Sequence, residues 1–253
     1  MGLLERESFL DAFEEYAEAA ARGSGRLVLL SGDAGIGKSA LVEAFRERRP
    51  ELRWLWGACD ASFTPRPLGP LFEVASQAGG EFRDLARAAA DRTELFARSV
   101  AALDRPGETT VLVVEDLHGA DDATLDWVSY LGRRLGRIHA LVILTYRTSE
   151  PLADATLATT LGRLATHGST RRMLLPPLSA RAVAQLVAGR GLDPVHVLRV
   201  SGGNPFYVTE IAADPTAPVP PSVADVVRAR VLRHSPAARR MLAAAVVVGP
   251  PTT

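Results

Sequence analysis

Residues 26–48, RLVLLSGDAGIGKSALVEAFRER, decide the fold of this chain. The run from Arg26 to Leu30 is short and apolar, as in a buried strand, and the run from Ala40 to Arg48 has the spacing of a helix. Between them lies the pattern G-x4-G-K-[ST], which is satisfied by Gly32, Gly37, Lys38 and Ser39. A strand that enters this pattern and a helix that leaves it predict a phosphate-binding loop.

The chemistry of this loop indicates ATP with magnesium as its ligand. Gly35 and Gly37 let the backbone curl so that successive N–H groups and the helix N-terminus face phosphate oxygens. Lys38 supplies a positive charge for the β and γ phosphates, and Ser39 offers a hydroxyl ligand to magnesium. The residues that we expect to bind the nucleotide here are Gly32, Ala34, Gly35, Ile36, Gly37, Lys38, Ser39 and Ala40.

Lys38 is the only lysine in the chain, and every other Lys or Arg position is an arginine. A sequence that uses arginine elsewhere keeps lysine where a compact ammonium on a slender stem is needed. The N-K-x-D motif with which small GTPases read guanine needs a second lysine, so the sequence excludes that class.

A second nucleotide motif is the apolar run Val111–Val114 followed by two carboxylates. One carboxylate of such a pair binds the magnesium shell and the other polarises the attacking water. By position alone we assign Glu115, together with Ser39, to the metal and Asp116 to the water. The reverse assignment stays open.

Three further side chains are candidates for this site. Arg147 follows the next apolar run, Leu141–Thr145, so we expect it to project toward the same edge and sense the γ-phosphate. The alternative is a surface arginine after a strand. His118 and Asp121 either orient the site or only cap the helix that begins at Asp122.

Alternating strand and helix signals predict an open α/β sheet of parallel strands with sites at their carboxyl ends. The expected strands are 26–30, 52–56, 110–114, 141–145 and 173–175. The tract from Pro65 to Pro70 is either a crossover or an effector loop.

Strand signals stop after Pro176. We therefore expect an α/β domain over 1–176, a small helical lobe over 177–213, a proline-rich linker over 214–221 and a last segment over 222–253. That segment ends in an apolar stretch that no later element covers, so we expect a domain cut short.

Composition restricts the partners of this 253-residue chain. Lys plus Arg equals Asp plus Glu, at 29 each, so no overall positive field favours nucleic acid or anionic lipid. The single cysteine, Cys59, is expected to be a small buried thiol. The sequence shows neither a secretory signal nor an apolar run long enough to cross a bilayer, which indicates a cytoplasmic protein.

In order and spacing, several motifs together resemble the STAND class of AAA+-related ATPases. They are GDAGIGKSALV, CDASFTPRPLGPL, VLVVEDLHGADDATLDWV, LVILTYR, PPLS and SGGNPFYV. The likeness is greatest to the N-terminal ATPase region of large LuxR-type bacterial transcription regulators, and it covers nearly the whole chain.

This resemblance implies roles for residues outside the phosphate loop. Arg147 falls on the sensor arginine after the fourth core strand, and Pro205 falls on a proline whose helical lobe closes over the nucleotide base. Leu4–Glu7 resembles the hinge beside adenine, with Glu5 where the family has glycine, and Gly119 stands where the family has tryptophan. Residues 222–253 resemble the start of a winged-helix domain.

The function that the resemblance implies is a switch. ADP holds a closed monomer, ATP frees surfaces for self-association, and slow hydrolysis resets the state. DNA contact is expected only through domains outside these 253 residues. The alternatives are an origin-recognition-like initiator ATPase that contacts DNA directly and a nucleotide-binding scaffold that does not hydrolyse; a small-molecule kinase is more remote, since no acceptor-binding pattern is evident.

Overall fold

The computed structural model describes residues 3–59, 67–88, 91–148, 154–214, 224, 225, 228, 231, 232 and 236–248. It divides into two compact units, Met1–Pro176 and Pro177–Thr253, and each is considered by itself. Within the described ranges, no helix has both the length and the apolar character needed to cross a membrane. The predicted linker after residue 214 and the tract 60–66 lie outside the described residues.

A five-stranded parallel sheet forms the centre of the first unit, in the order β2-β3-β4-β1-β5. This confirms the predicted fold class. The strands are β1 (Arg26–Ser31), β2 (Arg53–Ala58), β3 (Thr110–Glu115), β4 (Ala140–Tyr146) and β5 (Thr170–Leu174).

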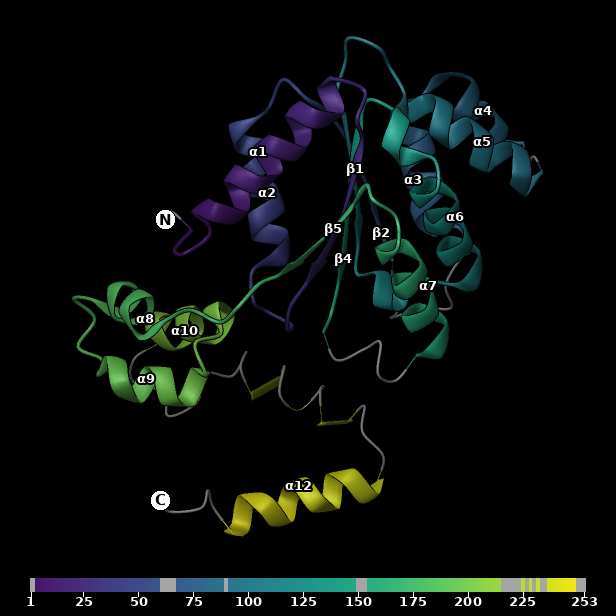
Figure 1. Ribbon diagram of the computed structural model, residues 1–253. Coiled ribbons are helices and arrows are strands. Elements are labelled where there is room, and N and C mark those ends of the chain that lie inside the picture. The colour runs from purple at the N-terminus through teal and green to yellow at the C-terminus, as the bar shows by residue number, and fades with distance from the viewer. Residues whose placement is uncertain are drawn as a thin grey trace. The chain divides into compact units, whose positions relative to one another are not determined.

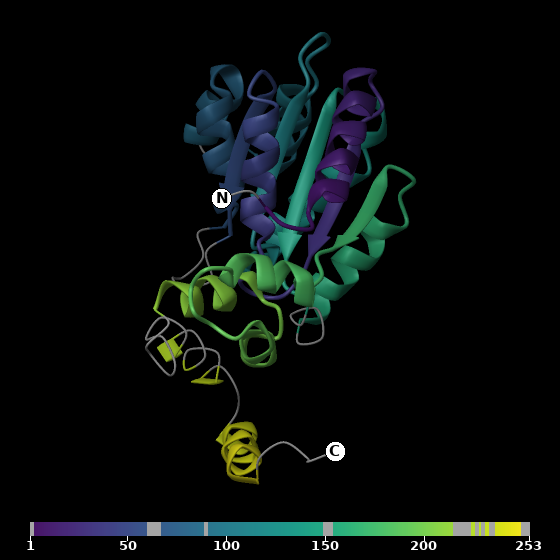
Figure 2. The ribbon, with the colours of Figure 1, turned by 90° about the vertical axis from the view of Figure 1, so that its left-hand side faces the viewer.

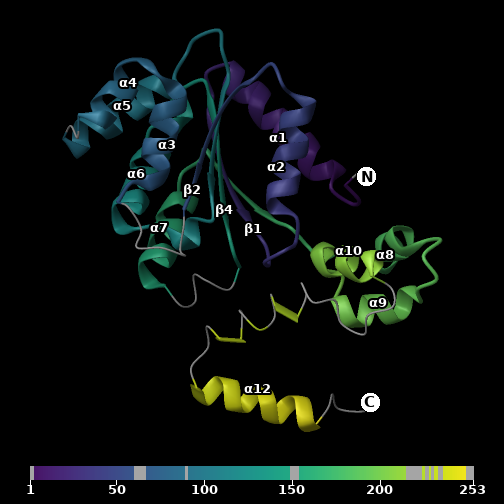
Figure 3. The same ribbon diagram turned by 180° about the vertical axis from the view of Figure 1, so that it is seen from behind.

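Helices cover both faces of this sheet (Figure 1). One face carries α1 (Glu7–Ala21) and α2 (Lys38–Arg48), which lie in front of the strands in Figure 2. The other face carries α3 (Gly69–Ala78), α4 (Gly80–Arg87), α5 (Arg92–Leu103), α6 (Asp122–Gly132) and α7 (Ala155–Ala165). These helices lie to the left of the strands in Figure 3, opposite α1 and α2.

Alternation along β1 explains why both faces must be covered. Leu27 and Leu29 pack into the core that α3 to α7 complete, whereas Val28 and Leu30 pack into the core under α1 and α2. All four side chains have no exposed surface. A strand that is apolar on both sides is stable only inside a helix-covered parallel sheet.

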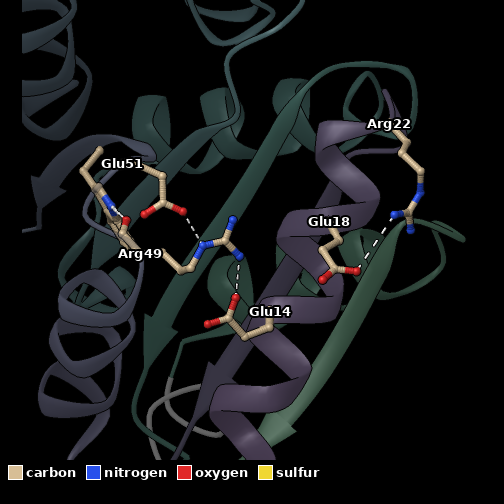
Figure 4. Close-up of polar contacts among 6 residues, drawn as sticks. Glu14, Glu18, Arg22, Arg49 and Glu51 are labelled. Atoms are coloured by element: carbon tan, nitrogen blue, oxygen red, sulfur yellow. Dashed lines mark hydrogen bonds and ion pairs between the residues drawn. The ribbon is translucent and has the colours of Figure 1, made fainter.

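Ion pairs join the outer surface of α1 to the end of α2. The Arg49 guanidinium lies between the carboxylates of Glu14 and Glu51, and Arg22 pairs with Glu18 one turn back along α1 (Figure 4). The more buried contact in this region is aromatic, because Phe13 and Phe45 meet with their ring centroids 5.2 Å apart. We therefore attribute the docking of α1 mainly to apolar burial, since exposed ion pairs contribute little.

The crossover before β5 contains α7, which the sequence analysis did not predict. Its signals are present: the Asp154 carboxylate accepts N–H bonds from the first turn, and Leu157, Leu161 and Leu164 repeat at helical spacing and are buried. Three helices, α3, α4 and α5, occupy residues 69–103, and Gly79, whose φ is +70°, separates the first two.

Side chains of α3 satisfy the open edge of β2. The Gln77 amide accepts from the N–H of Trp56 at 2.8 Å and donates to its carbonyl oxygen, while Glu73 accepts from the N–H of Ala58 at 2.9 Å. These bonds replace a neighbouring strand, which blocks further pairing at this edge.

The second unit is helical over its described residues. Side-chain oxygens of Ser179, Asp193 and Asn204 cap three of the helices. The capped helices are, in order, α8 (Ala180–Val187), α9 (Pro194–Ser201) and α10 (Pro205–Ala213). The last described helix is α12 (Pro236–Val248). The structure describes residues 222–253 only in part, and the expected winged-helix start stays a prediction.

Two glycine substitutions should change the free energy of unfolding in opposite directions, because Gly57 is closely packed against α3 and Gly162 is not packed against anything. A Cβ at Gly57 would lie 2.7 Å from the Pro70 carbonyl oxygen, so Gly57→Ala should lower the free energy of unfolding by about 1–3 kcal/mol through overpacking. Gly162 in α7 is exposed with nothing near its Cβ position, so Gly162→Ala should raise it by about 0.5–1 kcal/mol. Urea unfolding measures both, and a neutral Gly57→Ala would contradict the packing.

Candidate nucleotide and magnesium site

The phosphate-binding loop joins β1 to α2 at the carboxyl edge of the sheet. Gly35 and Gly37 have φ of +78° and +97°, a region that favours glycine. Gly37 is also the N-cap residue of α2 and has no side chain to satisfy the first N–H groups. The start of α2 therefore presents free backbone donors and a positive helix end to an anion.

Lys38 crosses the loop from the first turn of α2. Its side chain is nearly buried, and Nζ donates to the carbonyl oxygens of Gly32 at 2.9 Å and Asp33 at 3.1 Å. Burial lowers the pKa of Lys38; the negative charge of Asp116 opposes this shift, and the positive charge of Arg147 adds to it. The loop ammonium and the charged side chains that end β3 and β4 therefore lie within electrostatic reach of one another.

Glu115, the last residue of β3, holds two side chains with its two carboxylate oxygens. Oε1 accepts a hydrogen bond from the Ser39 hydroxyl, and Oε2 accepts from Nε1 of Trp56 at 2.9 Å. A hydroxyl beside one carboxylate is a donor set that suits magnesium, which takes one or two protein oxygens and completes its octahedron with water and phosphate. The structure thus brings together the two residues predicted to bind the metal.

Asp116 lies directly after β3 with left-handed backbone, at a φ of +53°. Its N–H donates to Thr145 Oγ1 on β4 at 3.0 Å, which fixes this turn. Its carboxylate is 53% exposed, with Oδ1 3.7 Å from Nδ1 of the buried His118. Asp116 is thus open to solvent while Glu115 is tied to the loop, a difference that fits the assignment made by position.

Asp121 has a structural task. Its Oδ1 accepts from the N–H of Thr124 at 3.1 Å, and its Oδ2 accepts from the Thr124 hydroxyl at 2.6 Å and from the N–H of Leu68 at 3.2 Å. It therefore caps α6 and ties residue 68 to it.

Arg147 and Pro205 belong to different units of the structure. Arg147 follows β4 immediately, at the same edge of the sheet as the phosphate loop, and its charge acts on Lys38. Pro205 is the first residue of α10, in the second unit. Its predicted role at the nucleotide base stays a prediction.

Sequence reasoning missed two residues. Trp56 reaches Glu115 because β2 pairs with β3 in a register that the sequence does not reveal. Arg6 is 2% exposed and donates from Nη2 to the carbonyl oxygen of Pro176 at 2.8 Å; burial lowers its pKa. Its neighbour Glu5 has a φ of +57°, a region that favours glycine.

Cys59 is buried, as expected, and burial raises its pKa to about 12. A thiol that stays protonated is a poor nucleophile at neutral pH. This residue is therefore part of the core.

A parallel sheet with a glycine loop, a buried lysine and a carboxylate on the adjoining strand defines a P-loop nucleoside triphosphatase. The model of the AAA ATPase domain family matches residues 2–144, and this chain belongs to that family. Membership implies nucleotide binding.

One relative in sequence is a guanylate kinase of Thermobifida fusca, which is 28% identical over 175 residues, or 69% of this chain and 72% of the relative. No acceptor site follows from a likeness at this level.

Solved structures share the fold at low identity. Cdc6p from Pyrobaculum aerophilum is 18% identical with a TM-score of 0.54, over 88% of this chain and 58% of that one. The Aeropyrum pernix Orc1 protein in complex with DNA is 16% identical with a TM-score of 0.56, over 91% and 66%. A signal transduction ATPase with numerous domains and a tetratricopeptide repeat sensor, from Pyrococcus horikoshii, is 16% identical with a TM-score of 0.53, over 85% and 31%. This chain thus spans less than two thirds of the length of each of these three proteins.

The bond from Trp56 to Glu115 gives a test of the metal side of the site. Trp56→Phe keeps an aromatic side chain and removes the Nε1–H donor to Glu115. ATP affinity in the presence of magnesium should therefore fall about 10-fold or more, as when a hydrogen-bond partner of a metal ligand is lost. Affinity without magnesium should not change. Trp54→Phe is the matched control, because its Nε1 donates to the Arg49 carbonyl oxygen instead. Calorimetric titration measures both, and equal losses would contradict the role of Trp56.

Proposed function

We propose that this chain is an ATP- and magnesium-binding regulatory ATPase module, part of a bacterial transcription regulator. The observation that carries the proposal is the contact between the Ser39 hydroxyl and the Glu115 carboxylate beside the buried Lys38. This contact joins the two nucleotide motifs in space.

Each residue would act through its own chemistry. Lys38 and the N–H groups of the loop bind the β and γ phosphates, and Ser39 with Glu115 holds magnesium, which would neutralise charge on the phosphates. Asp116 orients and polarises the attacking water, since it lies next to Glu115 and is open to solvent. Arg147 senses the γ-phosphate, and Pro205 brings the helical lobe to the base.

A switch is favoured over the alternatives by the combination of motifs and charge. The TM-scores to Cdc6p, to Orc1 and to the signal transduction ATPase, 0.54, 0.56 and 0.53, are too similar to distinguish an initiator from a switch. An initiator that contacts DNA directly gains from a positive field, and this chain has none overall. A scaffold without hydrolysis has no use for the second acid, Asp116.

Substitution of the two acids should separate their roles. Glu115→Gln should weaken magnesium-dependent ATP binding, because a charged metal ligand is lost. Asp116→Asn should leave binding intact and slow single-turnover hydrolysis by about 10²–10⁴-fold, because an amide does not accept the water proton. The reversed pattern would assign Asp116 to the metal and Glu115 to the water. If neither substitution slowed hydrolysis, the proposed catalytic site would be wrong.

GMP added to the same assay tests the kinase alternative. A kinase would transfer the γ-phosphoryl group to GMP instead of releasing phosphate.

The switch itself predicts a nucleotide-dependent change of assembly. With ATP and magnesium the chain should form a larger species than with ADP, measured by light scattering after size exclusion. Lys38→Ala should abolish this difference because the γ-phosphate loses its cation. ATP binding without any change in mass would contradict the switch while leaving nucleotide binding in place.

A further inference from the structure

A second charged region lies at the opposite edge of the sheet from the phosphate loop. The segments LGRRLGRIH (131–139) and RLATHGSTRR (163–172) hold six arginines and two histidines and no Asp or Glu. They contain the connections into β4 and β5, so they meet at the amino ends of two strands that are separated only by β1. The phosphate loop, in contrast, follows the carboxyl end of β1.

Between these two connections lies an open surface cavity of about 560 Å³. Arg133, Arg134 and Arg137 line it from one side and His167 from the other, and its remaining lining is glycine and one serine. No carboxylate is among the lining residues. The volume is in the range of small-ligand sites, although the cavity is open to solvent.

Several arginines of this unit pair with a carboxylate. Ion pairs of this kind involve Arg22, Arg48, Arg49, Arg83, Arg92, Arg98 and Arg105. Within the described part of the chain, the arginines at 133, 134 and 137 have no such partner. Three adjacent cations without a counter-ion repel one another, and an anion would relieve that repulsion.

The cavity is built on packed elements. Arg134 lies over the Tyr130 ring, 3.5 Å from its centroid, and donates to the Tyr130 carbonyl oxygen at 3.3 Å. Arg171 donates to the carbonyl oxygen of Gly168 at 2.8 Å, which holds the connection before β5. At Gly132 a Cβ would approach Leu164 to 2.4 Å, so α6 and α7 pack closely beneath the cavity. Folded structure therefore holds Arg134 and the connection before β5 in place.

We propose that this cavity is a binding site for a small anion with more than one phosphate group, separate from the nucleotide site. Guanidinium groups bind phosphate oxygens through paired N–H donors, and glycines leave backbone N–H groups accessible. A small ligand is favoured over nucleic acid because the chain has zero net charge and so lacks the overall positive field that nucleic acid binding uses. The site does not depend on the proposed ATPase function.

Inorganic pyrophosphate is the probe, and Lys38→Ala is the background, so that the phosphate loop contributes little. In this background, calorimetry should detect one saturable site. Adding Arg133→Gln, Arg134→Gln and Arg137→Gln should weaken binding at least 10-fold. The matched control removes three exposed arginines elsewhere, Arg87→Gln, Arg181→Gln and Arg199→Gln, and should leave binding within about 2-fold.

Several outcomes would overturn the proposal. One is the absence of saturable binding in the Lys38→Ala background; another is an equal loss in the control, which would mean a general charge effect. Arginine-dependent binding of a DNA duplex without binding of pyrophosphate would assign the surface to nucleic acid instead. If the triple variant does not fold, as judged by thermal unfolding, Arg137→Gln alone should weaken binding several-fold, and no change there would count against the site.

Discussion

The burial of β1 on both faces is the constraint on which the rest of the structure depends. Its side chains enter two separate cores, so the strand cannot shift by one residue without placing the wrong set on each side. The chain must then leave the sheet at Ser31 and return as α2, and the glycines at 35 and 37 make this turn possible. The core thus fixes where the phosphate loop begins, and the loop fixes where Lys38 and Ser39 point.

The two acids after Val114 have different surroundings because they lie on either side of a change in backbone conformation. Glu115 is still in β3, where its carboxylate reaches both Ser39 and Trp56. Asp116 has left the strand with a positive φ, which turns its side chain toward solvent. Two identical charges one residue apart can therefore serve different tasks, one held against the loop and one accessible to water.

The sequence predicted the sheet and the phosphate loop well because both depend on local patterns. Apolar runs and the glycine spacing need no knowledge of distant contacts. The bond of Trp56 and the burial of Arg6 were missed because they depend on strand register and on the return of the chain at Pro176. Helix α7 was missed although its signals, the leucines at 157, 161 and 164 and the cap at Asp154, are local.

The parallel sheet also explains how one small domain can hold two separate anion sites. Parallel strands place all their carboxyl ends at one edge, where α2 adds its positive end and Lys38 its charge. The amino ends meet at the other edge, where the positive charge for binding an anion must come from side chains. Arginines at 133, 134 and 137 supply that charge before β4. Because β4 continues to Thr145, which bonds the turn at Asp116, the two edges are joined by a single buried strand.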